Sequence, residues 1–215
     1  HGNAGSINDH LYFSEYLPEA GFNLFLFDYR GFGESGGKAR RRADLIADTH
    51  AALDAVLARD DVDPRRIGFF GHSLGGAIAL AVMAEREEVR AAAIMSAFSD
   101  WRGIAADSIG GGPIASFFAG LLIADGHSAK DAIARIDRPL LLIHGGADRI
   151  VPARHGRDLS AAAPHARWAE IPGGGHNDLR TSNPEVDELV IGFLRDELVA
   201  DPEPTRPESE DDASS

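Results

Sequence analysis

Residues 69–76 read Phe-Phe-Gly-His-Ser-Leu-Gly-Gly and contain a G-x-S-x-G motif centred on Ser73. The motif lies between an apolar run that predicts a buried strand and an alanine-rich run that predicts a helix. This strand–turn–helix context is typical of a nucleophile elbow, in which the sharp turn requires glycine on both sides of the serine. We therefore predict that Ser73 is a nucleophile exposed at the C-terminal edge of a sheet.

Apolar runs of strand length alternate with helical patterns along the whole chain, which is typical of an α/β protein with a parallel sheet. The runs are almost continuously hydrophobic, as expected for strands covered on both faces. The predicted strands are 23–27, 67–70, 91–95, 140–143 and 168–171. The predicted helices are about 8–19, 43–59, 74–86, 153–162 and 184–199.

Length and composition indicate a single globular domain over residues 1–199, followed by a tail, 200–215. The tail carries six acids, one arginine and three prolines, so we expect it to be disordered. The net charge of −13 argues against binding to nucleic acid. The chain has no cysteine, which removes disulfides, thiolate catalysis and Cys-ligated metals.

Residues 101–137 interrupt the alternation and predict a short helical cap over a pocket. The segment has a glycine-rich stretch at 110–112, followed by apolar residues at helical spacing. We expect the cap to line a substrate-binding pocket with four side chains: Phe117, Phe118, Leu121 and Leu122. The alternative is a core crossover helix behind a loose entry loop.

A serine nucleophile needs a base, and the base needs an orienting acid. His176 is the candidate base, because it lies in a glycine-rich loop directly after the last predicted strand. Asp148 is the candidate acid, because it follows the strand at 140–143 and so lies at the same sheet edge as Ser73. Asp100 is the rival acid.

An oxyanion hole needs two N–H donors aimed at the charge that develops in the transition state. Leu74, the residue after the serine, offers one from its backbone. The loop at 1–6 offers the second, for which we predict the N–H of Asn3, with Ala4 as the alternative.

With these residues assembled, the chain resembles the α/β-hydrolase superfamily from residue 1 to about 199. Its motif sequences are most similar to those of the branch that holds serine aminopeptidase-like and monoacylglycerol-lipase-like hydrolases. Five segments carry the resemblance: His1-Gly2-Asn3, Asp28-Tyr29-Arg30-Gly31-Phe32-Gly33-Glu34-Ser35, Gly71-His72-Ser73-Leu74-Gly75-Gly76, His144-Gly145-Gly146-Ala147-Asp148 and Gly175-His176. The order Ser73, Asp148, His176 matches that of the superfamily.

The resemblance also implies a mostly parallel, doubly wound sheet in which a central strand precedes the loop at His1, with two more strands before it. The chain contains none of these three strands. We therefore expect the 215 residues to be a fragment with two unpaired sheet edges that does not fold stably alone. Any signal or membrane anchor would lie upstream of His1.

The predicted function is a serine hydrolase that cleaves small-molecule carboxylic esters, acyl lipids included, through an acyl-enzyme on Ser73. No metal or organic cofactor is implied, because the glycine-rich loops lack phosphate-binding spacing and the histidines are scattered. An aminopeptidase or amidase is the first alternative, with Asp107 or Asp125 holding a substrate ammonium. A non-catalytic scaffold that binds a ligand is the second.

Overall fold

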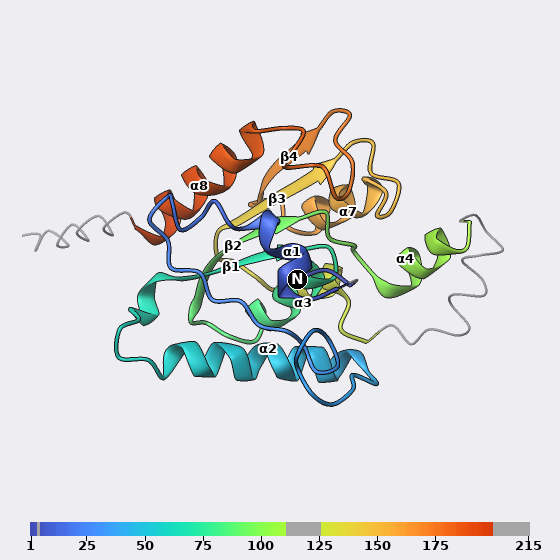
Figure 1. The fold of residues 1–215 in the computed structure, drawn as a ribbon. Coiled ribbons are helices and arrows are strands. Elements are labelled where there is room, and N and C mark those ends of the chain that lie inside the picture. The colour runs from blue at the N-terminus through green and yellow to red at the C-terminus, as the bar shows by residue number, and fades with distance from the viewer. Residues whose placement is uncertain (4, 111–125, 200–215) are drawn as a thin grey trace, which may run out of the picture.

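A sheet of four parallel strands, in the order β1-β2-β3-β4, forms the centre of the protein (Figure 1). The computed structural model describes residues 1–3, 5–110 and 126–199. The strands are β1 (Ile67–His72), β2 (Val89–Met95), β3 (Leu140–Gly145) and β4 (Arg167–Ile171). Four of the five predicted strands are thus confirmed, each within two residues at either end.

The strand register brings the ends of all four strands to one edge of the sheet. His72 of β1 pairs with Met95 of β2, which in turn pairs with Ile143 of β3. Gly145 pairs with Ile171 of β4. The loops that follow β1, β3 and β4 therefore leave the sheet from the same side, and they carry the three predicted catalytic residues.

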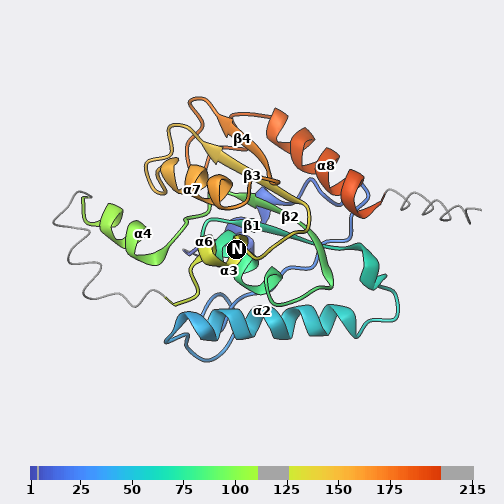
Figure 2. The same ribbon diagram turned by 180° about the vertical axis from the view of Figure 1, so that it is seen from behind.

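Helices cover both faces of the sheet, as the two views show (Figures 1 and 2). Side chains of β2 alternate between the two cores: Ala92 and Ile94 pack with α2, α3, α6 and α7, and Ala93 and Met95 pack with α8. The helical elements are α1 (Ile7–His10), η1 (Leu11–Phe13), α2 (Arg42–Leu57), η2 (Pro64–Arg66), α3 (Leu74–Met83), α4 (Trp101–Ser108), α6 (Ala129–Ile133), α7 (Arg154–Ala162) and α8 (Glu185–Leu198). This three-layer arrangement is the predicted fold class. Among these helices, none combines the length and apolar character of a membrane span.

The predicted strand at 23–27 is wrong, since these residues pair with no strand in the described part of the chain. Apolar side chains predicted extended backbone, but a strand also needs a neighbour to accept its hydrogen bonds. Phe25 and Leu26 remain 51% and 37% exposed. They border, with Phe70 of β1, a cavity of about 90 Å³. That three strands precede residue 1 stays a prediction.

The first predicted helix, at 8–19, is shorter than expected. It consists of α1 and η1, and residues 14–21 form turns. Pro18 prevents one helical hydrogen bond in the second half of the predicted helix, because it has no N–H to donate to the carbonyl of Ser14.

The two described ends of the predicted cap differ in their packing. Helix α4 projects from the body of the protein (Figure 1). Helix α6 packs against α3 and α7, with Ala129 and Ile133 fully buried. The four predicted lining residues lie in 111–125, outside the described residues. The tail, residues 200–215, also lies outside them.

Burial lowers the pKa of three histidines, His72, His144 and His155, below the ordinary value of about 6.5. Below that pH the unfolded chain binds more protons than the folded protein. We therefore expect the free energy of unfolding to be highest above about pH 6.5. It falls as the pH drops toward the folded-state pKa values, by up to ~1.4 kcal/mol per pH unit for each histidine. Urea denaturation at several pH values measures this slope.

The control uses two glutamine variants. His155→Gln removes one buried titrating ring and should reduce the slope, and Gly192→Gln, in α8, changes no titratable group and should leave it unchanged. A free energy of unfolding that does not change between about pH 7 and pH 5 would contradict the prediction.

Candidate active site

Ser73 lies in the turn between β1 and α3 with a positive φ of 55° and a ψ of −118°. Its N–H donates to the Met95 carbonyl at 2.9 Å, which continues the pairing of β1 with β2 into the turn. A Cβ on Gly71 would lie 2.7 Å from Gly76 Cα, and one on Gly75 would lie 2.7 Å from the His1 carbonyl oxygen. Close packing therefore requires glycine on both sides of the serine, as predicted.

The predicted exposure of Ser73 is wrong, because the residue is only 9% exposed. Its neighbour His72 is buried as well, and the backbone of His1 packs directly on Gly75. The elbow is thus packed against the N-terminal loop, and little of Ser73 is accessible to solvent.

Asp148 and His176 form a buried pair, joined by a 2.7 Å hydrogen bond between Asp148 Oδ2 and His176 Nδ1. They are 6% and 7% exposed. The other carboxylate oxygen, Oδ1, accepts the N–H groups of Ile150 and Val151 at 2.9 and 2.8 Å. With both oxygens engaged the carboxylate cannot rotate freely. The pair leaves His176 Nε2 free to accept a proton, since Nδ1–H donates to Asp148.

Main-chain hydrogen bonds connect the loop that carries Asp148 to the loop that carries His176. The N–H of Gly146 donates to the Ile171 carbonyl at 2.8 Å, and the N–H of Ala147 donates to the Gly174 carbonyl at 2.9 Å. A Cβ on Gly145 would collide with the Gly174 carbonyl. This close approach explains the glycine at position 145.

His176 also lies beside the elbow. Its ring centroid is 4.7 Å from that of His72, the residue before the serine. Within the described contacts, however, Ser73 Oγ makes no hydrogen bond to His176. Such bonds between a catalytic base and its nucleophile are often long before substrate binds. The structure therefore brings Asp148 and His176 together and places the ring of His176 beside the residue that precedes Ser73.

The predicted oxyanion residues come from the loop at 1–3 and from the first turn of α3. Leu74 is the first residue of a ten-residue helix, so its N–H has no partner four residues earlier in that helix. The backbone of His1 contacts Gly75, which brings the loop that contains Asn3 to the same turn. Ala4 lies outside the described residues.

The rival acid, Asp100, has other partners. It is the N-cap of α4, where its Oδ1 accepts the N–H of Gly103 at 2.6 Å. Ser99 Oγ contacts its other oxygen at 3.1 Å. Asp148, by contrast, binds His176 directly.

Asp107, the first candidate for binding a substrate ammonium, is already paired. Arg154 and His155 of α7 contact its Oδ2 at 2.6 and 3.0 Å. Burial would raise the pKa of this carboxyl, but the bonds from Arg154 and His155 outweigh it and the pKa is lowered. Asp107 thus attaches α4 to α7. Asp125, the second candidate, is outside the described residues.

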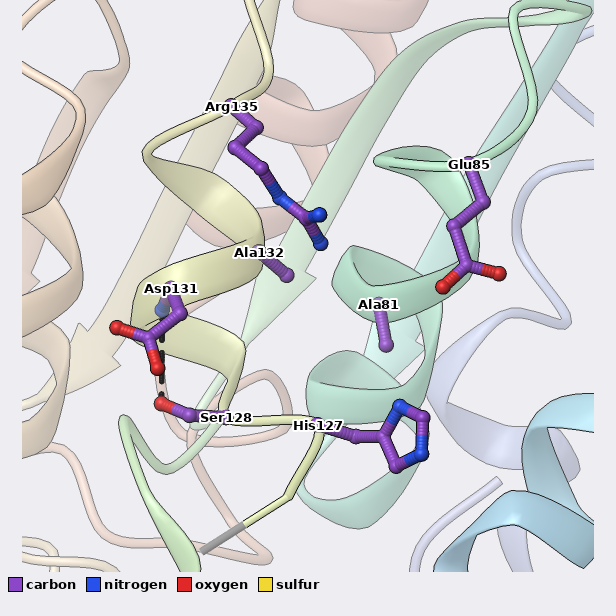
Figure 3. Close-up of a pocket in the computed structure, with 7 residues that line it drawn as sticks. All are labelled: Ala81, Glu85, His127, Ser128, Asp131, Ala132 and Arg135. Carbon is purple, nitrogen blue, oxygen red and sulfur yellow. Dashed lines mark hydrogen bonds between the residues drawn. The ribbon is translucent and has the colours of Figure 1, made fainter.

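A cavity of about 430 Å³ lies elsewhere, between α3 and α6 (Figure 3). Ala81 of α3 and Glu85, two residues past the end of that helix, line it. Ala81 lies eight residues beyond Ser73, which is ~12 Å along the helix axis. The remaining lining residues are His127, Ser128, Asp131, Ala132 and Arg135. The cavity therefore belongs to the far end of α3 and not to the elbow. Among the described residues, no group of three or more His, Asp or Glu is arranged to hold a metal.

Sequence reasoning missed two buried histidines that support the site. His144 contacts the Val151 carbonyl through Nε2 at 2.8 Å and so braces the loop of Asp148. His72 contacts the His176 carbonyl through Nε2 at 3.2 Å. The only sequence signal was position: each is a polar residue at the end of an apolar strand.

The parallel sheet, the elbow after β1 and the Asp–His pair at the same edge define an α/β-hydrolase fold. A solved esterase of Pyrococcus furiosus is similar, with a TM-score of 0.75 and 22% identity over 92% of this chain and 80% of that one. A bromoperoxidase of Bacillus anthracis is also similar, with a TM-score of 0.70 and 18% identity over 91% and 90%.

The chain belongs to the hydrolase family described as serine aminopeptidase, S33, whose model matches residues 1–110. The uncharacterized protein YfhR of Escherichia coli is 41% identical over 182 residues, which cover 83% of this chain. The chain spans about 61% of the length of that curated relative.

Gly75→Ala should destabilise the protein by about 1–3 kcal/mol, because the new methyl group would overlap the His1 backbone. The matched control is Gly192→Ala in α8, where a Cβ meets nothing within 4 Å. This control should stabilise by up to about 1 kcal/mol through helix propensity. Denaturant unfolding measures both, and equal effects at the two glycines would contradict the packing argument.

Proposed function

We propose that the protein is a serine hydrolase that cleaves carboxylic esters, with Ser73 as nucleophile, His176 as base and Asp148 as the orienting acid. The observation that carries the proposal is the buried 2.7 Å hydrogen bond between Asp148 and His176, at the sheet edge where Ser73 turns out of β1. Membership of a hydrolase family supports it.

In the first half of the reaction, Ser73 Oγ attacks the ester carbonyl carbon while His176 Nε2 takes the hydroxyl proton. Asp148 stabilises the imidazolium that forms, through the bond at Nδ1. The N–H groups of Leu74 and Asn3 bind the oxyanion, and the positive end of α3 favours the same charge.

In the second half, His176 gives its proton to the leaving alcohol, and an acyl-enzyme remains on Ser73. Water then enters, loses a proton to His176 Nε2 and attacks the acyl carbonyl. Collapse of the second tetrahedral intermediate returns the proton to Ser73 and releases the acid. Every step uses groups of this chain and a small-molecule ester.

An aminopeptidase with the same residues is the second candidate, favoured by the description of the matching family. An aminopeptidase must hold the substrate ammonium with a free acceptor. Asp107 is occupied by Arg154 and His155, which weakens its case for that task. Esters, which need no such acceptor, therefore remain the first choice.

Ser73→Ala should abolish both ester hydrolysis and labelling by a fluorophosphonate probe. Asp148→Asn should lower kcat by roughly 10³–10⁴-fold, because His176 loses the acceptor that fixes its tautomer. Asp100→Asn is the matched control and should stay within about threefold of wild type, since Asp100 caps α4 instead. Labelling that survives Ser73→Ala would refute the mechanism, and an unlabelled wild-type protein would support a non-catalytic scaffold.

Asp107→Asn should not change the ratio of kcat/KM values for matched ester and aminoacyl-anilide substrates. Its carboxylate serves Arg154 and His155, so its loss should lower thermal stability instead. A selective loss of anilide cleavage would assign Asp107 to a substrate ammonium and favour the aminopeptidase.

A further inference from the structure

His72, which occupies the first of the two variable positions in the G-x-S-x-G motif, contacts three separate parts of the site. Its ring is 4% exposed and stacks on Phe13, with centroids 3.8 Å apart and an interplanar angle of 22°. A Cβ on Gly2 would lie 3.5 Å from its Nδ1, so the ring also borders the N-terminal loop. Its other neighbour is the ring of His176, at 4.7 Å.

The hydrogen bonds of His72 define its protonation. Nε2 lies 3.2 Å from the carbonyl oxygen of His176. A carbonyl only accepts, so Nε2 must carry the proton and donate. Nδ1 has no hydrogen-bond partner among the described residues, so it is left with a buried lone pair. Burial first, and then the neighbouring His176, lower the pKa of His72. The ring is therefore neutral and acts as a fixed donor.

An unpartnered buried nitrogen costs about 1–3 kcal/mol, and an aromatic ring of similar size would avoid that cost. The histidine at this position is thus poor for stability and is explained by its one hydrogen bond. That bond joins residues 104 positions apart, from the elbow to the loop of the base.

The loop of His176 needs such a support. Main-chain hydrogen bonds hold this loop as far as Gly174, and only the flexible Gly175 separates Gly174 from His176. Asp148 holds the ring of His176 from one side through Nδ1. His72, the residue directly before Ser73, holds the main-chain carbonyl of His176 through Nε2.

We propose that His72 is a positioning residue, which ties the backbone of His176 to the nucleophile elbow and so sets the distance from His176 Nε2 to Ser73 Oγ. The inference rests on the proposed function, in which His176 is the base. It adds a role for a residue outside the three catalytic ones. A small displacement of the base is costly, since a misplacement of about 1 Å can reduce the rate ~100-fold.

The test compares two substitutions at this position. His72→Phe keeps an aromatic ring against Phe13 but removes the donor, whereas His72→Gln can place an amide N–H near the position of Nε2. We expect His72→Phe to lower kcat for a p-nitrophenyl ester by ~10- to 100-fold with KM changed less than about twofold. His72→Gln should restore kcat to within about threefold of wild type.

Two further readouts separate positioning from a structural role. The melting temperature of His72→Phe should equal or exceed that of wild type, because the substitution removes an unpartnered buried nitrogen. The pH profile of kcat/KM should differ from that of wild type in His72→Phe and match it again in His72→Gln, because the carbonyl of His176 loses and then regains its donor.

Wild-type kcat in His72→Phe would overturn the inference, as would a glutamine variant no better than phenylalanine. The inference would also be overturned if kcat fell only in those variants whose melting temperature falls as well. The proposed function fails by a different result, namely fluorophosphonate labelling that persists in Ser73→Ala or His176→Ala. The two failures are therefore distinguishable in one set of proteins.

Discussion

Ser73 keeps a positive φ that costs a non-glycine residue about 1–3 kcal/mol, and the site depends on the packing that maintains it. All ten residues of α3 are buried, which fixes the helix that follows the serine. On the other side, the bond from the Ser73 N–H to Met95 fixes the end of β1. Because β1 and α3 are both fixed, the turn that joins them holds Ser73 at its positive φ.

The same edge of the sheet also explains why the acid and the base meet. Parallel register brings the ends of β3 and β4 together, and Asp148 and His176 follow these ends by only three and five residues. One carboxylate oxygen of Asp148 accepts hydrogen bonds from its own loop, and the other accepts one from His176. The geometry of the pair is therefore set before any substrate arrives, which is what a low reorganisation cost requires.

The sequence predicted the elements whose signal is local. Continuous apolarity identified β1 to β4, and the glycines around Ser73 identified the elbow. Features that depend on distant partners were not predictable in this way. Residues 23–27 have the composition of a strand but no neighbour to pair with in the described part of the chain. The burial of Ser73 is not predictable from local sequence either, because it depends on packing such as that of the distant His1 backbone against Gly75.

The supporting side chains were unpredictable for the same reason. Asp107 looked available for a ligand, yet its partners lie 47 and 48 positions later in the chain. The motif gives His72 no role of its own, and its hydrogen-bond partner is 104 positions away. Asp148 and His176 could be chosen because position after a strand was sufficient to bring them to one edge.

The main-chain bonds between the Asp148 and His176 loops have a consequence for how these loops tolerate change. Main-chain hydrogen bonds join Gly146 to Ile171 and Ala147 to Gly174. Every residue type except proline can supply the N–H groups that these bonds need. Side chains at the outward-facing positions of both loops are thus free to vary without moving the pair. Inserting or deleting a single residue shifts every peptide group past its partner, so loop length is constrained more tightly than loop composition.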